Sequence, residues 1–209
     1  MIIEAIQIGG FDIFCYVLGD ADTGEGIVVD PGGPAQAILA RAKKHGVTAI
    51  KMIVNTHCHV DHTAGNKEMQ EATGAPLAIH EADAQGLVHQ NPGMLAMFGA
   101  DASPKATVLL KDGDKITFGK ESVQVIHTPG NTPGGICLYW PGYVITGDTL
   151  FVQGVGRTDL PGGSFAVLEN SIRTRLFTLP ADTIVLPGHN YGSTPTSTIG
   201  REKAENAFL

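Results

Sequence analysis

The chain has 209 residues, of which 43% are hydrophobic and 17% are charged, a size and balance that suit one globular domain with a full core. Its formal net charge of −7 argues against nucleic acid and anionic membranes as partners, and no apolar run approaches the roughly 18 residues of a membrane span. Three cysteines without a Cys-x-x-Cys pair, and an amino-terminus without signal-peptide features, predict a protein of the reducing cytoplasm.

The first half of the chain alternates short apolar segments with helical ones. Segments that are β-branched, aromatic and bounded by turns predict strands over residues 1–8, 12–19, 26–32, 50–57 and 76–80. Helical spacing of apolar residues, with Pro34 at the start and Gly46 after the end, predicts a helix over residues 34–45. A second helix is expected over residues 65–73, and a short one from Glu81.

The second half returns to strands after a segment rich in Gly, Pro and Met. That segment, residues 90–105, is expected to lie irregularly on the surface. Strands are expected over residues 116–119, 122–129, 135–140, 143–149 and 183–189. Helices are expected over residues 164–178, with Ser164 as the N-cap, and near the end of the chain, over residues 197–209. This order suggests two sheets covered by helices, with the topology left open.

Three histidines and an aspartate follow the fourth predicted strand within six residues. In the segment NTHCHVDHTAGN they are His57, His59, Asp61 and His62. Imidazole nitrogens and carboxylate oxygens are ligands that zinc and iron accept. In an extended segment His57, His59 and Asp61 would point to one side and Cys58 to the other, so Cys58 is not expected to bind metal. A chance cluster on a solvated loop is the less favoured interpretation, because four ligand-type residues at this spacing seldom serve packing.

Two further ligand-type residues follow predicted strands in the same way. Asp148 comes near the end of YVITGDT, and His189 ends TIVLPGH. A lone aspartate or histidine at a strand end is more often a cap or a turn residue. Because the histidine cluster occupies an equivalent place after its own strand, we expect all of these residues to share one polar site at the sheet ends.

Five motifs together resemble the metallo-β-lactamase superfamily, and within it the glyoxalase II-like thioester hydrolases. The motifs are THCHVDHTAGN, HTPGNTPGG, TGDTLF, GRTDLPGG and LPGHNYG, in the family's order, and the earlier IVVDPGG also fits. The resemblance implies an α/β fold, an αββα sandwich of two mixed sheets flanked by helices, with a two-metal site along one edge. Because only 20 residues follow His189, we expect a single domain over residues 1–209, without the family's C-terminal glutathione-binding helical domain.

The resemblance assigns metal ligands residue by residue. The first metal takes His57 and His59, the second takes Asp61, His62 and His189, and Asp148 bridges both. Zinc is the expected metal, with one or two ions per chain, and iron or manganese are alternatives. Asp61 is also expected to act in catalysis by orienting the attacking hydroxide.

The chain departs from the family at one ligand position. The first metal normally takes a third histidine from the loop after TPG, and here that position is Asn131. An amide oxygen is a weaker donor than an imidazole nitrogen, so the first site is expected to bind metal less tightly than the second. His127 is expected to hydrogen-bond locally rather than to replace the missing ligand. The other three histidines match no motif and are interpreted as surface or helix-end residues: His45, His80 and His89.

The resemblance implies hydrolysis of a small-molecule thioester, such as S-lactoylglutathione or a related acyl thiol, by a metal-bound hydroxide. Metal coordination lowers the pKa of water from 15.7 toward roughly 7, and a thiolate leaves without a general acid. Activity is expected to be impaired by Asn131. Arg157 is a candidate for binding a glutathione carboxylate, with an ion pair to Asp159 as the equally favoured alternative. Asp159 stands where the family has an aromatic residue, which counts against glutathione specificity.

Two other functions remain open at this point. A persulfide dioxygenase would use one iron held by the equivalents of His57, Asp148 and the loop histidine, so Asn131 counts against it, although GRTD also occurs in that branch. A metal-depleted binding module would keep the fold without turnover. Oxygen uptake with glutathione persulfide distinguishes the dioxygenase from a hydrolase, and metal content distinguishes the binding module from both enzymes. The sequence makes no prediction of the oligomeric state.

Overall fold

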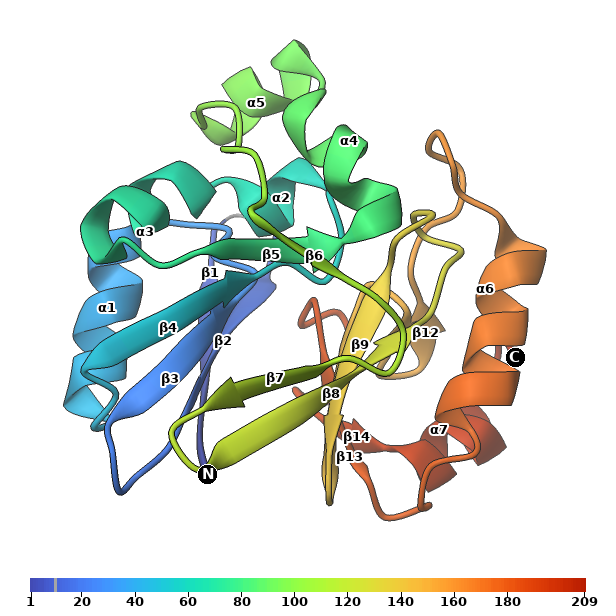
Figure 1. Ribbon diagram of the computed structural model, residues 1–209. Helices are drawn as coiled ribbons and strands as arrows, with labels where there is room; N and C mark the ends of the chain where they lie inside the picture. Colours follow the sequence, from blue (N-terminus) through green and yellow to red (C-terminus); the bar gives the residue numbers. More distant parts are fainter. Residues whose placement is uncertain (10) are drawn as a thin grey trace.

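Two sheets of six strands each lie face to face in the computed structural model, which describes residues 1–9 and 11–209, and helices cover both outer sides (Figure 1). The first sheet contains, in spatial order, β1 (Ile2–Ile8), β2 (Ile13–Gly19), β3 (Glu25–Val29), β4 (Ala49–Val54), β5 (Leu77–His80) and β6 (Val108–Leu110). The second contains β14 (Ser197–Thr198), β13 (Ile184–Pro187), β10 (Tyr143–Gly147), β9 (Ile136–Trp140), β8 (Glu121–His127) and β7 (Lys115–Phe118). This is the αββα sandwich that the sequence predicted.

Both sheets are mixed, and their parallel pairs position the site. In the first sheet β3, β4, β5 and β6 run parallel, while β1, β2 and β3 are antiparallel. In the second sheet only the β10–β13 pair is parallel among the described strands. The carboxyl ends of parallel neighbours meet at the same sheet edge, so the residues after β3 and β4, and those after β10 and β13, are brought together. A separate pair is formed by β11 (Leu150–Phe151) and β12 (Gly154–Val155).

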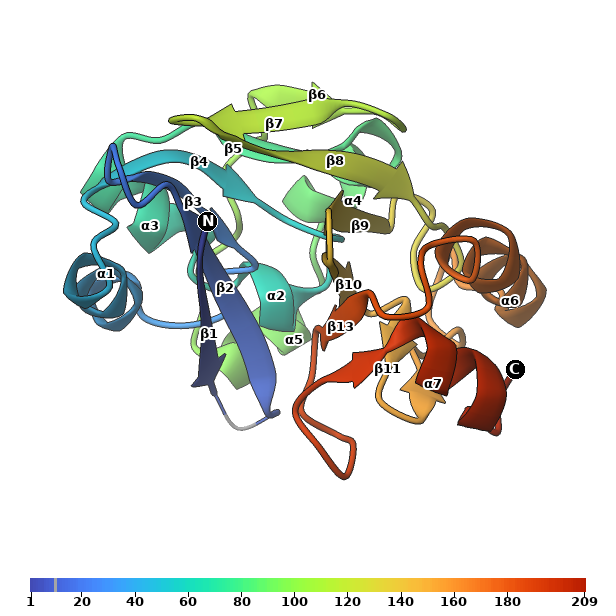
Figure 2. The ribbon, with the colours of Figure 1, turned by 90° about the horizontal axis from the view of Figure 1, so that it is seen from below.

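Helices cover the outer faces of the sandwich (Figure 2), and shorter ones lie over its upper end in the view of Figure 1. The first sheet is covered by α1 (Ala35–Lys44) and α3 (Asn66–Thr73), and the second by α6 (Phe165–Ser171), its π-helical continuation Ile172–Leu176, and α7 (Ile199–Glu205). The shorter elements are α2 (Val60–Thr63), the 3₁₀ turn Glu81–Asp83, α4 (Ala84–Val88) and α5 (Pro92–Phe98). No helix within the described ranges combines the length and the apolar character that crossing a membrane requires.

Strand β2 shows how the sequence builds a core in layers. All seven of its residues are buried. Because successive side chains of a strand point to opposite faces, Phe14 and Tyr16 pack between the sheets, whereas Cys15 and Val17 pack under α1 and α3. The Tyr16 hydroxyl also donates to the Pro187 carbonyl across the sheets over 2.7 Å. A third apolar cluster lies between the second sheet and α6 and α7.

Some elements differ from the sequence expectations. Residues 90–105 are not wholly irregular, because α5 forms there, with the Asn91 side chain capping its first turn and Pro92 at its first position. Ser164 does precede α6, but its side chain makes no capping hydrogen bond. Asp61 lies in α2 and not in an extended segment. The terminal helix is confirmed over Ile199–Glu205.

Candidate metal centre

The six predicted metal ligands come together at the edge where the two sheets meet. His57 and His59 lie in the loop after β4, Asp61 and His62 in α2, Asp148 directly after β10, and His189 after β13. The backbone joins the sheets at this edge, because the Phe14 amide donates to the Gly188 carbonyl over 2.8 Å and Ile13 forms an isolated bridge with His189. Ligand candidates far apart in sequence therefore share one small region.

These residues fall into two groups, each with ligand atoms that all lie within 4.8 Å of one another: His57, His59 and Asp148, and Asp61, His62 and His189. Asp148 faces both groups, since its Oδ2 is 3.9 Å from His57 Nε2 and its Oδ1 is 3.2 Å from His62 Nε2. The grouping matches the assignment that the family resemblance implied. The roles of the six residues as ligands, and that of Asp61 in catalysis, stay predictions.

Asp30, which directly follows β3, orients two of the histidines. Its carboxylate accepts hydrogen bonds from the Thr56 amide (2.7 Å), the Thr56 hydroxyl (2.6 Å) and His62 Nδ1 (3.0 Å). Because the Thr56 hydroxyl donates to Asp30, it accepts from His57 Nδ1, 3.0 Å away. Both rings thus carry a proton on Nδ1 and turn Nε2 toward the site.

Sequence reasoning did not assign Asp30. The available signal was its place in IVVDPGG, an aspartate at the end of a strand that pairs in parallel with β4. Its φ of 51° is left-handed, a conformation that aspartate tolerates better than most residues with a side chain. Asp30, His57 and His62 also each offer a ligand atom, and these three atoms lie within 4.8 Å of one another. Since its oxygens already accept three hydrogen bonds, its role is to orient these rings.

His189 and His62 make a contact that requires a cation. His189 Nδ1 lies 2.8 Å from the main-chain carbonyl of Phe11, so it donates there and leaves a lone pair on Nε2. His62 Nε2 also carries a lone pair by the argument above, and the two Nε2 atoms are 3.1 Å apart. Two lone pairs at this separation repel each other unless a proton or a metal ion binds them. The donor set therefore fits a metal ion such as zinc or iron.

The charges around the site follow from burial and from the neighbouring groups. Burial lowers the pKa of His57 well below its ordinary value, and nearby His62 lowers it further. Burial would also lower the pKa of His62 and His189, but the Asp148 and Asp61 carboxylates outweigh burial. They raise the pKa of His189 to about 9 and that of His62 well above its ordinary value. The same histidines hold the pKa of Asp148 well below its usual range against the effect of burial. The carboxylates thus draw positive charge into the space between them.

Asn131 belongs to the same small cavity as the first group. Its lining includes His57, Asn131 and Asp148. Three buried polar atoms have no hydrogen-bond partner here, namely His57 Nε2, Asn131 Oδ1 and Asp148 Oδ1. The Asn131 side-chain nitrogen donates to the Arg157 carbonyl over 2.8 Å, which fixes the orientation of the amide. Unpartnered buried acceptors are costly, and cations would satisfy them, one bound by His57 and Asn131 in the first group and one by Asp148 Oδ1, which faces the second group.

The remaining histidines have local partners. His127 Nε2 lies 3.0 Å from the Pro133 carbonyl, and its ring stacks on His80 with centroids 4.0 Å apart. His127 is therefore engaged locally, as the sequence predicted. His80 is 5% exposed and so does not lie on the surface, but it caps the 3₁₀ turn, which is the helix-end position that the sequence also allowed. His45 and His89 do lie at helix ends.

Two residues at the mouth of the site matter for a substrate. Arg157 forms two hydrogen bonds of 2.8 Å to the Asp159 carboxylate, and both side chains are exposed. This ion pair is the alternative that the sequence left open, and a substrate role for Arg157 stays a prediction. Tyr191, which sequence reasoning did not single out, stacks on the His189 ring with centroids 4.5 Å apart and is 57% exposed.

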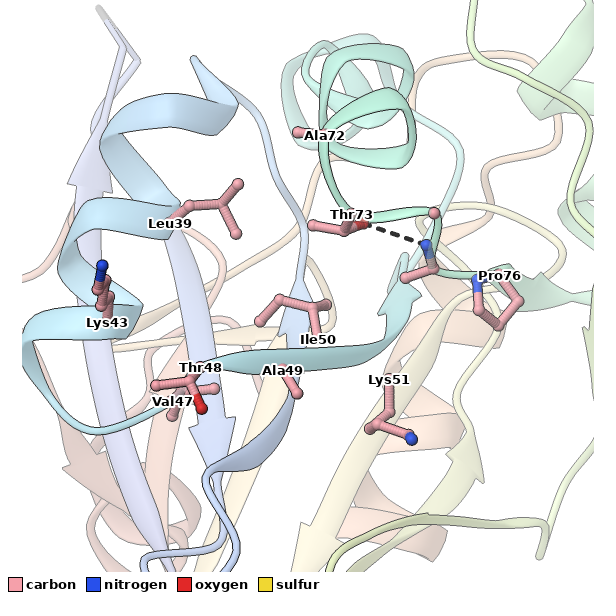
Figure 3. A pocket seen from close by; sticks show the side chains of 12 residues that line it. Leu39, Lys43, Val47, Thr48, Ala49, Ile50, Lys51, Ala72, Thr73 and Pro76 are labelled. Atoms are coloured by element: carbon pink, nitrogen blue, oxygen red, sulfur yellow. Dashed lines mark hydrogen bonds between the residues drawn. The ribbon is translucent and has the colours of Figure 1, made fainter.

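A larger groove, of about 730 Å³, lies away from these residues between the ends of α1 and α3 and the start of β4 (Figure 3). It is lined by apolar side chains such as Leu39 and Ile50 and by Lys43 and Lys51. Lys51 is paired with Glu25 over 3.2 Å. None of the predicted ligands lines this groove, so its size does not bear on the metal centre.

Comparisons with known proteins agree with this geometry. Hydroxyacylglutathione hydrolase GloC of Haemophilus influenzae is 32% identical over 100% of this chain and 98% of its own length. The human mitochondrial persulfide dioxygenase ETHE1 is 29% identical over 94% of this chain and 71% of its own. The crystal structure of TTHA1623 in a di-iron-bound form has a TM-score of 0.86 and 30% identity, covering 99% of this chain and 100% of that one. The profile of the Metallo-beta-lactamase superfamily matches residues 8–189, and the chain belongs to this superfamily of metal-dependent hydrolases.

Proposed function

We propose that this chain hydrolyses small thioesters, such as S-lactoylglutathione or a related acyl thiol, with two neighbouring metal ions. The observation that carries the proposal is the position of Asp148, whose two oxygens face the two separate groups of candidate ligands. The likeness to a hydroxyacylglutathione hydrolase over the whole chain supports the substrate class. When bound, the ions supply an activated water, because coordination lowers the pKa of water from 15.7 toward roughly 7.

Asp61 is suited to hold the attacking water. Burial would raise the pKa of its carboxyl group, but His62 and His189 outweigh burial and keep that pKa below its usual range, so the group is ionised at neutral pH. Its Oδ2 lies 3.4 Å from His189 Nε2, and its side chain is 20% exposed, which leaves the carboxylate accessible from the mouth of the site. An ionised, accessible carboxylate accepts a hydrogen bond from water and so orients it.

The two metal sites are expected to differ in affinity. The second group offers two imidazoles and a carboxylate, which suit zinc. The first offers His57, His59 and Asp148 and, in place of a third imidazole, the unpartnered Oδ1 of Asn131. Because an amide oxygen is the weaker donor, we expect the first site to fill later. Zinc is the first metal to test and iron the second, since a relative binds two irons.

The substrate is expected to be small and thiol-derived. A thiolate leaves without protonation, so the site needs no general acid at the leaving group. Arg157 is held by Asp159 at the mouth, and it can meet a glutathione carboxylate only by sharing or breaking that ion pair. We therefore expect simple acyl thioesters to be hydrolysed about as readily as the glutathione thioester.

The test is thiol release from S-lactoylglutathione and from a simple acyl thioester, measured with zinc-loaded and iron-loaded protein whose metal content is known. Hydrolysis of either substrate that disappears on chelation and returns with metal is the expected result. Failure with both substrates, in the wild type and in an Asn131→His variant loaded with two metal ions, would contradict the proposal. A β-lactam in the same panel measures how far the site discriminates between carbonyl substrates.

A persulfide dioxygenase is the second candidate, because a relative with that name aligns over 94% of this chain. Such an enzyme would hold one iron through His57, Asp148 and a histidine that is Asn131 here. The second group of ligands, complete in this chain, would then be without a use. Oxygen uptake by iron-loaded protein with glutathione persulfide distinguishes the two activities: uptake without thioester hydrolysis would favour the dioxygenase.

A further inference from the structure

Asp83 is a buried carboxylate outside the six predicted ligands, at the end of the 3₁₀ turn after β5. It is 1% exposed. Its Oδ2 accepts hydrogen bonds from the Cys58 amide (3.0 Å) and the Thr132 hydroxyl (2.7 Å), and its Oδ1 accepts one from the Gly134 amide (2.6 Å). Burying a carboxylate is costly unless it is hydrogen-bonded, and these three donors make the arrangement stable. Asp83 therefore holds two separate loops at fixed positions.

Both of these loops carry members of the first metal group. Cys58 lies between His57 and His59, and Thr132 directly follows Asn131. The Asp83 carboxylate thus sets the distance between the imidazoles of the first loop and the amide of the second. Neither loop is part of a regular strand or helix at these positions, and the Asp83 side chain adds to the backbone hydrogen bond that joins the two segments nearby, from the Ile136 amide to the Thr56 carbonyl (2.9 Å).

The loop at Gly134 approaches Asp83 closely because residue 134 is a glycine. A Cβ added there would lie 2.6 Å from the Asp83 amide nitrogen and 2.7 Å from its Cβ, closer than such atoms normally approach. Only glycine lets the loop come near enough for its amide to reach the carboxylate.

A second polar side chain holds the other side of Cys58. Gln90 donates to the Cys58 carbonyl (3.1 Å) and to the Thr63 hydroxyl at the end of α2 (2.6 Å). The peptide groups on both sides of Cys58 are therefore fixed, one by Asp83 and the other by Gln90. The residue between the two histidines thus has little freedom, which holds both imidazoles in place.

We propose that Asp83 is a positioning residue that sets the affinity of the first metal site without binding the metal. This inference rests on the proposed metal-dependent function. The second group, Asp61, His62 and His189, has no hydrogen bond to Asp83 among the described residues. Loss of the Asp83 carboxylate therefore weakens the first site and leaves the second unchanged. Residues that orient metal ligands typically contribute about 10–100-fold in metal affinity.

The test is an Asp83→Asn variant, which keeps the size of the side chain and removes one of its two acceptor oxygens. Stepwise zinc affinities are measured by competition with a chromophoric chelator, and total zinc by elemental analysis. We expect the weaker step to fall about 10–100-fold and the tighter step to stay within about twofold. Cobalt substitution adds a spectroscopic readout, in which the absorption of the first site changes and that of the second does not.

Glu202 offers a matched control, because it is equally buried and its carboxylate also accepts three hydrogen bonds, from Ser197, Gln153 and Asn206. It lies in α7, away from the metal centre. Glu202→Gln should lower the unfolding temperature without changing either zinc affinity. If Asp83→Asn does the same and no more, Asp83 is merely structural and the inference is overturned.

A second variant keeps the inference testable if Asp83→Asn does not fold. Thr132→Val removes one of the three donors and should weaken the first site by a smaller factor, whereas Thr132→Ser, which keeps the hydroxyl, should not. Unchanged zinc affinities in Thr132→Val would also overturn the inference. Wild-type protein that binds no metal would overturn both the proposed function and this inference. Wild-type protein that binds metal, with variants whose zinc affinities are unchanged, would overturn this inference alone.

Discussion

The side-chain nitrogen of Asn131 donates to the main-chain carbonyl of Arg157 over 2.8 Å, and this one hydrogen bond fixes the orientation of an amide whose oxygen is buried without a partner. The reverse orientation would place two oxygens in contact. The amide is therefore oriented before any ion binds, and Asn131 lines the same small cavity as His57 and Asp148. A weak donor that is already held in place loses less freedom on binding, so we expect Asn131 still to contribute to the first site.

Replacing Asn131 by histidine should strengthen the first site. An imidazole nitrogen is the better donor for zinc, so we expect the affinity of the weaker step to rise at least 10-fold and thioester hydrolysis to rise with it. Chelator competition and thiol release at a fixed zinc concentration measure the two effects. An Asn131→Leu variant is the control and should weaken the first site. A histidine variant with wild-type affinity would show that the loop does not present this position to the metal.

Removing the Thr56 hydroxyl should free the His57 ring. Thr56→Val leaves His57 Nδ1 and one oxygen of Asp30 without their shared partner. We expect a loss of about 1–3 kcal/mol in the free energy of unfolding, because a buried polar group stays unpaired, and a first-site affinity about 10–100-fold lower. Denaturant unfolding and metal titration measure these quantities. Thr56→Ser keeps the hydroxyl and should show neither effect.

The stability of the metal-free protein should fall as the pH rises from 6.5 to 9. His189 has its pKa raised from 6.5 to about 9, and that of His62 is raised in the same direction, so both bind protons more tightly when folded than when unfolded. Their contribution is complete below the unfolded pKa and is lost as the pH passes the folded one. Unfolding temperatures of metal-free protein across this range measure the effect. Binding zinc should release protons, and zinc-loaded protein should not show the decline.

Arg157→Ala separates recognition of glutathione from the chemistry of the thioester. If Arg157 leaves Asp159 to meet a glutathione carboxylate, the variant should raise KM for S-lactoylglutathione several-fold and leave kcat unchanged. A simple acyl thioester has no such carboxylate and should be hydrolysed as before. Because both side chains are exposed to water, the ion pair itself contributes little to stability, so the fold should be unaffected. Equal KM values for both proteins would assign Arg157 to the ion pair alone.

The order of elements indicated two sheets covered by helices, and the family resemblance supplied the sandwich. The sequence also placed all six candidate ligands in one site, because each of them lies just after a strand or in the helix that follows, where local patterns are informative. It could not show Asp30 or Asp83. Asp30 acts on Thr56, 26 residues away, and Asp83 on Gly134, 51 residues away, and such contacts leave no mark in local spacing. Sequence reasoning also missed α5, because that helix buries none of its residues and so lacks an amphipathic pattern.

Each metal group draws its members from both sheets: His57 and His59 from the first, with Asp148 from the second, and Asp61 and His62 from the first, with His189 from the second. Bound ions would therefore cross-link the two halves of the molecule, much as a pair of disulfides would. Chelation should then do more than stop turnover. It should weaken the contact between the two sheets, let each half unfold separately and expose the region between them to proteases. The supply of metal should therefore govern the lifetime of the protein as well as its rate of turnover.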